Sequence, residues 1–349
     1  MIKRERSIRS LFIPVPNGVK RILSPFIYFS YRVLFCYMKF FKRLLYLLLV
    51  LFLLLNVITA FHAWKFTHFY PAGLYKNKKP EQMNAWEKAK TVLLGVRLSK
   101  SVVRIKPDTP FETVLLHTAS GLKLEAWWIP SPKAIGTVIL FHGYGGCKDG
   151  TLAEASYFRQ LGYNTFLLDF RGNGNSDGYT CTVGFKEAED VKLAYNYVQQ
   201  RGEKHIILWG MSMGAAAILK AVPEYKLQPD KVILECPFAT LTDAVKARMR
   251  AVHVPGTPFS QVLTFWGGVE HGFWGAGYKP EAYAREIKMP ALVCWGALDF
   301  RVTRHETDLI YQHLNSKKKQ LVVFNESYHQ SFCRKEPLKW KTAVKKFLQ

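Results

Sequence analysis

The sequence predicts an α/β fold class, with a mostly parallel sheet of eight strands covered by helices on both faces and one apolar helix before it. Two observations lead to this prediction. From residue 112 onward, short apolar runs typical of strands alternate with helical patterns, which is characteristic of a parallel sheet buried on both sides. Ahead of that region, residues 44–63 contain no Asp, Glu, Lys or Arg and are long enough to cross a bilayer.

The first 43 residues form a basic segment. They hold ten Lys and Arg residues and one acid, Glu5, in a chain whose formal net charge is +23. Because the uncharged stretch follows directly, a membrane is favoured over nucleic acid as the partner of this segment. Basic residues before the span outnumber those just after it, which predicts a cytoplasmic N-terminus and a location outside the cytoplasm for the rest of the chain.

Three alternatives stay open for this region. The apolar stretch 44–63 is predicted to be an uncleaved signal-anchor, with a cleaved signal peptide as the competing interpretation. A chain that began at Met38 would have the basic residues and the apolar run that a secreted or anchored protein needs at its N-terminus. Residues 1–37 are therefore a candidate over-extension of the start codon. Residues 22–41, aromatic and interrupted by two basic residues, also fit a helix lying along the membrane surface.

Residues 64–110 are rich in Lys and Pro and predict a neck with a helix near residues 81–94, followed by an α/β domain over residues 111–349. Two β-rich runs open that domain and are separated by a turn signal at residues 119–121. The six cysteines have no regular spacing, so neither a disulfide framework nor a zinc site is predicted. The predicted strands are 112–118, 122–129, 137–141, 164–168, 205–209, 232–235, 291–295 and 321–324.

The strand at residues 205–209 runs into Gly-x-Ser-x-Gly at residues 210–214 and then into a run of alanines. This pattern predicts a sharp turn between a strand and a helix, which exposes the hydroxyl of Ser212 above the edge of the sheet. The glycines stand where a Cβ would collide with neighbouring backbone. The alternative is an ordinary glycine-flanked turn with no chemical role.

A serine hydroxyl needs a base to take its proton and an acid to orient that base. Asp299 follows the strand 291–295, and His329 follows the last strand through a short loop, so both are expected at the same sheet edge as Ser212. Backbone N–H groups of Tyr144, in the glycine-rich turn 142–146, and of Met213 are predicted to bind the oxyanion. This chemistry requires no metal and no organic cofactor.

The motifs at residues 142–146, 169–178 and 210–214, with Asp299 and His329, resemble the α/β-hydrolase superfamily in order and spacing over residues 110–349. The chain is similar to short-lidded, membrane-anchored serine hydrolases that include protein depalmitoylases and lysophospholipid lipases. This resemblance implies hydrolysis of an ester or thioester through an acyl-enzyme. The turn at residues 295–299 is less polar than in many family members, although Asp299 is retained.

Residues 237–290 occupy the position of a lid. A helix is predicted over residues 240–252 with Lys246, Arg248 and Arg250 on it, and glycine-interleaved aromatic residues follow. Those aromatic residues are predicted to bind the apolar acyl chain of a lipid-like ester, or else to pack the lid onto the domain. They are Phe265, Trp266, Phe273 and Trp274. A peptidase of the same fold and a non-catalytic binding protein on this scaffold remain the alternatives.

Overall fold

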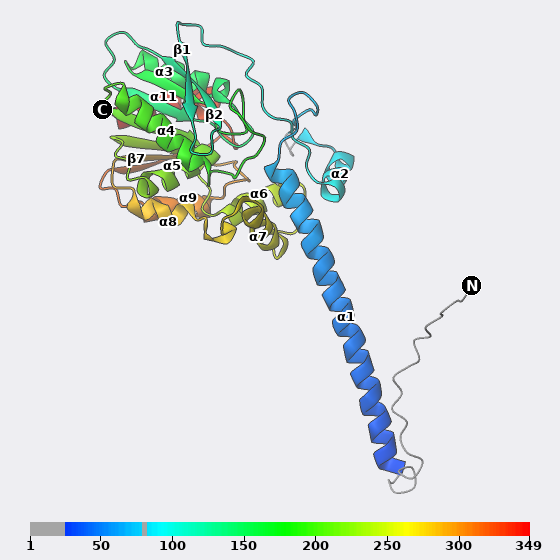
Figure 1. Cartoon of the computed structure of the whole chain (residues 1–349). Helices are drawn as coiled ribbons and strands as arrows, with labels where there is room; N and C mark the ends of the chain where they lie inside the picture. The colour runs from blue at the N-terminus through cyan, green and yellow to red at the C-terminus, as the bar shows by residue number, and fades with distance from the viewer. Residues whose placement is uncertain (1–24, 79–81) are drawn as a thin grey trace, which may run out of the picture. The chain divides into compact units, whose positions relative to one another are not determined.

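The computed structural model describes residues 25–78 and 82–349 and divides into two compact units, Met1–Val57 and Ile58–Gln349 (Figure 1). The described residues of the first unit all lie in helix α1 (Pro25–Thr67), which continues into the second unit. The first 24 residues of the predicted basic segment lie outside the described residues. The helix extends beyond the predicted span at both ends, because no Gly or Pro interrupts residues 26–67.

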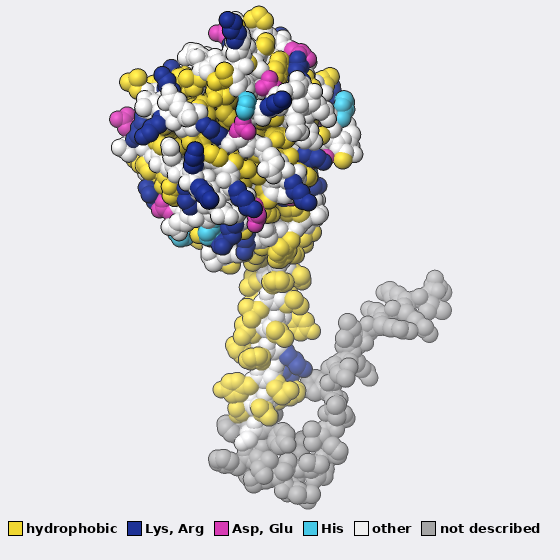
Figure 2. Space-filling model, turned by 90° about the vertical axis from the view of Figure 1, so that its left-hand side faces the viewer, with side chains coloured by type: hydrophobic (Ala, Val, Ile, Leu, Met, Phe, Trp, Pro, Cys, Tyr) yellow, Lys and Arg dark blue, Asp and Glu magenta, His cyan; other side chains and the backbone are white. Residues whose placement is uncertain are grey.

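Helix α1 contains a stretch, Val33–Thr67, that is long and apolar enough to cross a membrane. Only 6% of its most apolar window is buried by other parts of the chain. Figure 2 shows hydrophobic side chains over much of the surface of α1. A long helix that exposes leucine and phenylalanine on all sides is suited to a lipid environment.

The second unit is built on one eight-stranded sheet with the order β1-β2-β4-β3-β5-β6-β7-β8. Strands β1 and β2 form the predicted hairpin, β2 also runs antiparallel to β4, and all other neighbours are parallel. The strands are β1 (Glu112–His117), β2 (Lys123–Ile129), β3 (Thr137–Phe141), β4 (Asn164–Leu168), β5 (Ile206–Met211), β6 (Lys231–Glu235), β7 (Ala291–Gly296) and β8 (Lys319–Phe324). The predicted fold class is therefore confirmed.

Helices cover both faces of this sheet, so successive residues of the central strand β3 enter different cores. Ile139 packs in the core formed with α4 and α5, whereas Leu140 packs in the core formed with α3 and α11. Both side chains are fully buried, which explains the continuous apolar run at this strand. The helices of the domain are α3 (Leu152–Gln160), α4 (Glu187–Gln200), α5 (Met213–Glu224), α6 (Leu241–Ala251), α7 (Phe259–His271), α8 (Pro280–Tyr283), α9 (Arg304–His313), α10 (Phe332–Lys335) and α11 (Pro337–Leu348).

The segment predicted to be a neck packs into the second unit. The N–H of Phe69 donates to the carbonyl of Tyr179 at 2.6 Å, and the N–H of Cys181 donates to the carbonyl of Thr67 at 2.9 Å. Helix α2 (Ala85–Leu94) lies within the predicted helical region and begins at a capping box formed by Asn84 and Glu87. The end of α1 and the residues after it therefore belong to the same compact unit as the sheet.

Candidate active site

Ser212 occupies the sharp turn between β5 and α5, with backbone angles φ 53° and ψ −110°. A positive φ is rare for a residue with a side chain and marks a strained, tightly held turn. A Cβ on Gly210 would lie 2.6 Å from the backbone of Gly214, and one on Gly214 would lie 2.3 Å from the carbonyl oxygen of Phe141. Both glycines are thus required by close backbone packing, as the Gly-x-Ser-x-Gly spacing predicts.

The structure brings Ser212, His329 and Asp299 together although they are far apart in sequence. Ser212 follows β5, Asp299 follows β7 and His329 follows β8, and because these strands are parallel their carboxyl ends share one edge of the sheet. Nε2 of His329 lies 3.0 Å from Oγ of Ser212, and Nδ1 of His329 lies 2.8 Å from Oδ2 of Asp299. These distances allow a proton to pass from the serine to the imidazole.

Asp299 is held rigidly by the turn that follows β7. Its Oδ1 accepts hydrogen bonds from the backbone N–H groups of Arg301, at 2.8 Å, and Val302, at 3.0 Å. Its side chain is fully buried. Burial by itself raises the pKa of Asp299, but the hydrogen bond and charge of His329 and the two N–H groups outweigh it, so the pKa is lower than usual. The carboxylate therefore stays ionised beside the imidazole.

Tyr144 and Met213 both border the space beside Ser212. Met213 is the first residue of α5, where the N–H has no acceptor within the helix and the helix dipole favours negative charge. Tyr144 is held by its side chain: the ring stacks on Phe66 at 4.8 Å, and the hydroxyl donates to the carbonyl of Phe66 at 2.5 Å. Burial raises the pKa of this hydroxyl, so it remains protonated.

A buried ion pair, which no sequence motif indicates, supports the loop that carries Tyr144. The ammonium of Lys148 contacts the carboxylate of Asp169 and lies 2.9 Å from Glu125, while Lys148 and Asp169 are both fully buried. The N–H of Asn175 also donates to Asp169, at 2.9 Å. Asp169 thus ties the glycine-rich loop 169–178 to the loop after β3, which fixes the backbone next to the serine.

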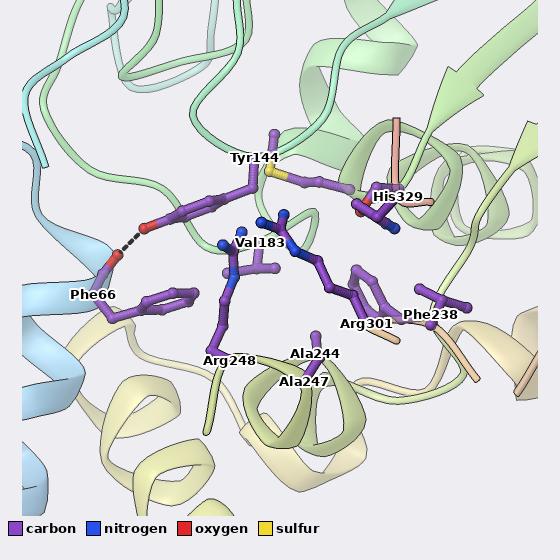
Figure 3. Close-up of a pocket in the computed structure, with 12 residues that line it drawn as sticks. Phe66, Tyr144, Val183, Phe238, Ala244, Ala247, Arg248, Arg301 and His329 are labelled. Carbon is purple, nitrogen blue, oxygen red and sulfur yellow. Dashed lines mark hydrogen bonds between the residues drawn. The ribbon is translucent and has the colours of Figure 1, made fainter. Parts of the chain in front are cut away.

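A pocket opens beside the serine (Figure 3). Its wall combines apolar side chains with two guanidinium groups, those of Arg248 from α6 and Arg301 from the turn after Asp299. In Figure 3 both arginines point into the same space as Tyr144 and His329. The lining residues are Phe66, Tyr144, Val183, Ser212, Met213, Phe238, Ala244, Ala247, Arg248, Arg301, Val302 and His329.

The four aromatic lid residues predicted to bind the substrate lie outside this wall. Phe273 stacks on Phe185 with ring centroids 3.9 Å apart, so it packs the lid onto the body. Phe265 and Trp274 are 39% and 64% exposed, and the ring of Trp266 contacts Phe265. The end of α1 and the first turns of α6 supply the apolar wall instead. Sequence reasoning missed Phe66, because it lies beyond the predicted span and its ring position depends on Tyr144.

Two side-chain groups in the described part of the chain have potential metal-ligand atoms within 4.8 Å of one another. One consists of Cys236, Asp299 and His329, but there the carboxylate and the imidazole are already paired with each other. The other consists of His68, Glu270 and His271, none of which lines the pocket beside the serine. Burial raises the pKa of the Cys236 thiol, which makes it a poor thiolate ligand.

Known proteins resemble this chain in sequence and in fold. A family model described as serine aminopeptidase, S33 matches residues 132–265. The chain is 27% identical to the uncharacterized protein YqkD of Bacillus subtilis, over 67% of this chain and 78% of that one. It is 27% identical to the lysophosphatidylserine lipase ABHD12 of Danio rerio, over 67% of this chain and 65% of that one. The esterase Pf2001 of Pyrococcus furiosus superposes with a TM-score of 0.59 and 25% identity, covering 71% of this chain and 97% of its own.

Fold, motifs and relatives together define a class, the serine ester hydrolases of the esterase and lipase type. The chain has the α/β-hydrolase fold that its sequence motifs predict, and the family model and the esterase Pf2001 support its similarity to that superfamily.

Proposed function

We propose that the protein hydrolyses a carboxylic ester or thioester with an apolar acyl chain, through an acyl-enzyme on Ser212. The observation that carries this proposal is the unbroken hydrogen-bonded series from Ser212 through His329 to Asp299, with distances of 3.0 and 2.8 Å. The strained backbone of Ser212 supports it, because such strain is typical of a nucleophile presented at a turn.

In the proposed mechanism, Oγ of Ser212 bonds to the carbonyl carbon while Nε2 of His329 takes the hydroxyl proton. Asp299 orients the imidazole and stabilises its positive charge. The N–H groups of Tyr144 and Met213 bind the oxyanion. The intermediate then expels the alcohol or thiol, which receives the proton from His329. Water attacks the acyl-enzyme by the same route, with His329 again acting as base, and releases the acid.

The pocket wall supports a substrate with an apolar part and an anionic part. Its apolar side chains suit an acyl chain, and the guanidinium groups of Arg248 and Arg301 suit a phosphate or carboxylate. The relative named lysophosphatidylserine lipase is consistent with such a substrate.

Peptide hydrolysis is the second candidate, because the matching family model is described as a serine aminopeptidase. An aminopeptidase has to hold the ammonium group of a peptide N-terminus, for which a carboxylate is the natural partner. Among the described residues that line the pocket, the permanent charges other than the triad belong to Arg248 and Arg301, and both are positive. Their charge disfavours an ammonium group, so we place the ester first. The intact triad disfavours the non-catalytic alternative.

Helix α1 supports the further proposal that the protein is anchored in a membrane by a single span. The excess of basic residues before the span favours a cytoplasmic N-terminus and a catalytic domain outside the cytoplasm. Carbonate extraction of the full chain and protease digestion of right-side-out vesicles test both parts. Release by carbonate contradicts the anchor, and protection from protease contradicts the orientation.

A p-nitrophenyl ester series from two to twelve carbons tests the activity. We expect kcat/KM to rise up to roughly tenfold for each two added carbons until the pocket is full, because each buried methylene contributes ~0.8 kcal/mol. Ser212→Ala should lose at least ~1000-fold in kcat. The matched control is Ser120→Ala, in the turn between β1 and β2, which should retain full activity. A wild-type rate in Ser212→Ala would contradict the mechanism. A preference for the acetate ester would contradict only the proposal that the substrate has a long apolar acyl chain.

The proposed binding of an anionic substrate group can be tested separately. Arg248→Gln should raise KM for a lysophospholipid with an anionic head more than for one with a zwitterionic head. Lys246→Gln is the control, because Lys246 lies on the same helix, pairs with Asp243 and does not line the pocket. Equal effects on both lipids would contradict a role for Arg248 in binding the head group.

A further inference from the structure

Helix α7 of the lid fully buries only small residues and exposes two of its large apolar residues. The buried residues of the helix are Ser260, Thr264 and Gly268, which recur every four residues on one face. Phe265 and Val269 are 39% and 50% exposed. In a helix on the surface of a water-soluble domain the opposite arrangement is expected.

Close backbone packing explains the inward face. A Cβ on Gly268 would lie 2.4 Å from the carbonyl oxygen of Phe273, and one on Gly275 would lie 2.2 Å from the carbonyl oxygen of Thr264. The chain after α7 therefore folds back against the small residues and leaves no room for larger ones. Trp274, at this fold-back, is 64% exposed and its ring contacts Phe265. The outward surface thus continues from the helix into the loop.

This surface lies beside the end of α1. The ring of His271, the last residue of α7, stacks on His68 with centroids 5.3 Å apart, and His68 directly follows the last residue of α1. If the hydrocarbon layer ends near residue 63, five helical residues place His68 about 7.5 Å beyond it. That distance corresponds to the head-group region of a bilayer.

Helix α2 presents a second apolar surface next to the same end of α1 (Figure 1). None of its residues is buried, and Trp86 and Leu93 are 76% and 75% exposed. Gly95, which ends α2, packs so closely on α1 that a Cβ would lie 2.7 Å from the side chain of Lys65. Trp64 of α1 itself is 43% exposed.

We propose that these residues form a collar that contacts the bilayer around the point where α1 leaves it, with α7 lying in the head-group region. The collar consists of Phe61, Trp64, Trp86, Leu93, Phe265, Val269 and Trp274. Tryptophan is enriched at this depth of membranes, and contiguous exposed apolar surface is rare on soluble domains. The inference rests on the proposed span by α1. Since α7 packs on α6, which forms part of the pocket wall, the collar holds the pocket close to lipids.

Site-specific fluorescence quenching tests the collar without relying on catalysis. The full chain carries Cys36→Ser, which removes the one exposed cysteine of the described residues, and a single added cysteine for an environment-sensitive fluorophore. The test position is Val269→Cys. The matched control is Leu338→Cys on α11, another large apolar residue, which is 84% exposed. Leu51→Cys in α1 reports the span itself.

In phosphatidylcholine vesicles that contain doxyl-labelled lipid, we expect severalfold stronger quenching at positions 269 and 51 than at position 338. Aqueous iodide should give the reverse order. If position 51 is quenched by lipid but position 269 is quenched no more than position 338, the collar is overturned. The membrane anchor is then still supported. Shielding of position 269 from both quenchers would mean that a protein surface covers it, which also overturns the proposal. Absence of lipid quenching at position 51 would overturn the anchor together with the collar.

Discussion

Both carboxylate oxygens of Asp299 form hydrogen bonds within the protein. One accepts from two backbone N–H groups, and the other pairs with His329. Asparagine at this position can keep an acceptor for the N–H groups of Arg301 and Val302 but loses the negative charge and favours the wrong imidazole tautomer. We expect Asp299→Asn to lower kcat by roughly 10⁴-fold, as in comparable triads, with an unchanged circular dichroism spectrum. Asp308→Asn on α9 serves as control. Activity within tenfold of the wild type would show that another acid orients the base.

Glu235 is a carboxyl on β6 whose complete burial favours the protonated form. Burial, followed by the nearby charge of Glu154, raises its pKa from 4.5 to about 8, although the indoles of Trp209 and Trp340 donate to one oxygen. The folded protein therefore holds a proton that the unfolded chain releases between these pH values. The stability that this proton contributes is complete below pH 4.5 and is lost as the pH rises through 8.

Glu235→Gln keeps the shape and removes this titration. Wild-type unfolding free energy should fall between pH 5 and 8 with a slope of up to ~1.4 kcal/mol per pH unit from this group, and the variant should lack that component. Urea unfolding at several pH values measures both proteins. Parallel pH profiles would contradict the assignment of a proton to Glu235.

At the scale of elements, the loops after β3 and β4 depend on Lys148 and Asp169, which are fully buried. Asp169→Asn leaves the ammonium of Lys148 with a weaker partner in an apolar interior. We expect a loss of roughly 3–5 kcal/mol in unfolding free energy. Asp308→Asn, which removes the exposed pair with Arg304, should cost no more than ~1 kcal/mol. Thermal unfolding of both variants measures the difference, and equal losses would contradict the structural role of the buried pair.

The strands and the serine turn were predictable from sequence because local patterns determine them. Continuous apolar runs identified the buried strands, and Gly-x-Ser-x-Gly identified the turn at Ser212. The pocket wall was not predictable in the same way. Phe66 and Arg301 reach it through long-range packing and turn geometry, for which the sequence has no periodic signal. The aromatic residues of α7 are visible in the sequence, but the direction of their side chains depends on how Gly268 and Gly275 pack.

For the whole molecule, one long apolar helix and one hydrolase body suggest an enzyme that works next to a lipid surface. The pocket lies at the sheet edge where the ends of β5, β7 and β8 meet, and the lid helices α6 and α7 adjoin it. The end of α1 also reaches this edge, because Phe66 forms part of the pocket wall. The proposed anchor and the proposed active site therefore share helix α1, and changes near residue 66 are expected to affect both.

Ser212 is proposed to be the nucleophile, and mass spectrometry of a covalent adduct identifies the residue that reacts. The full chain is treated with a fluorophosphonate, digested and mapped. We predict one adduct, on the peptide that contains Ser212, which forms rapidly in the wild type and is absent in Ser212→Ala. His329→Ala should retain the serine but label far more slowly, because its base is missing. Rapid labelling of a different residue, or an adduct that persists in Ser212→Ala, would contradict the account.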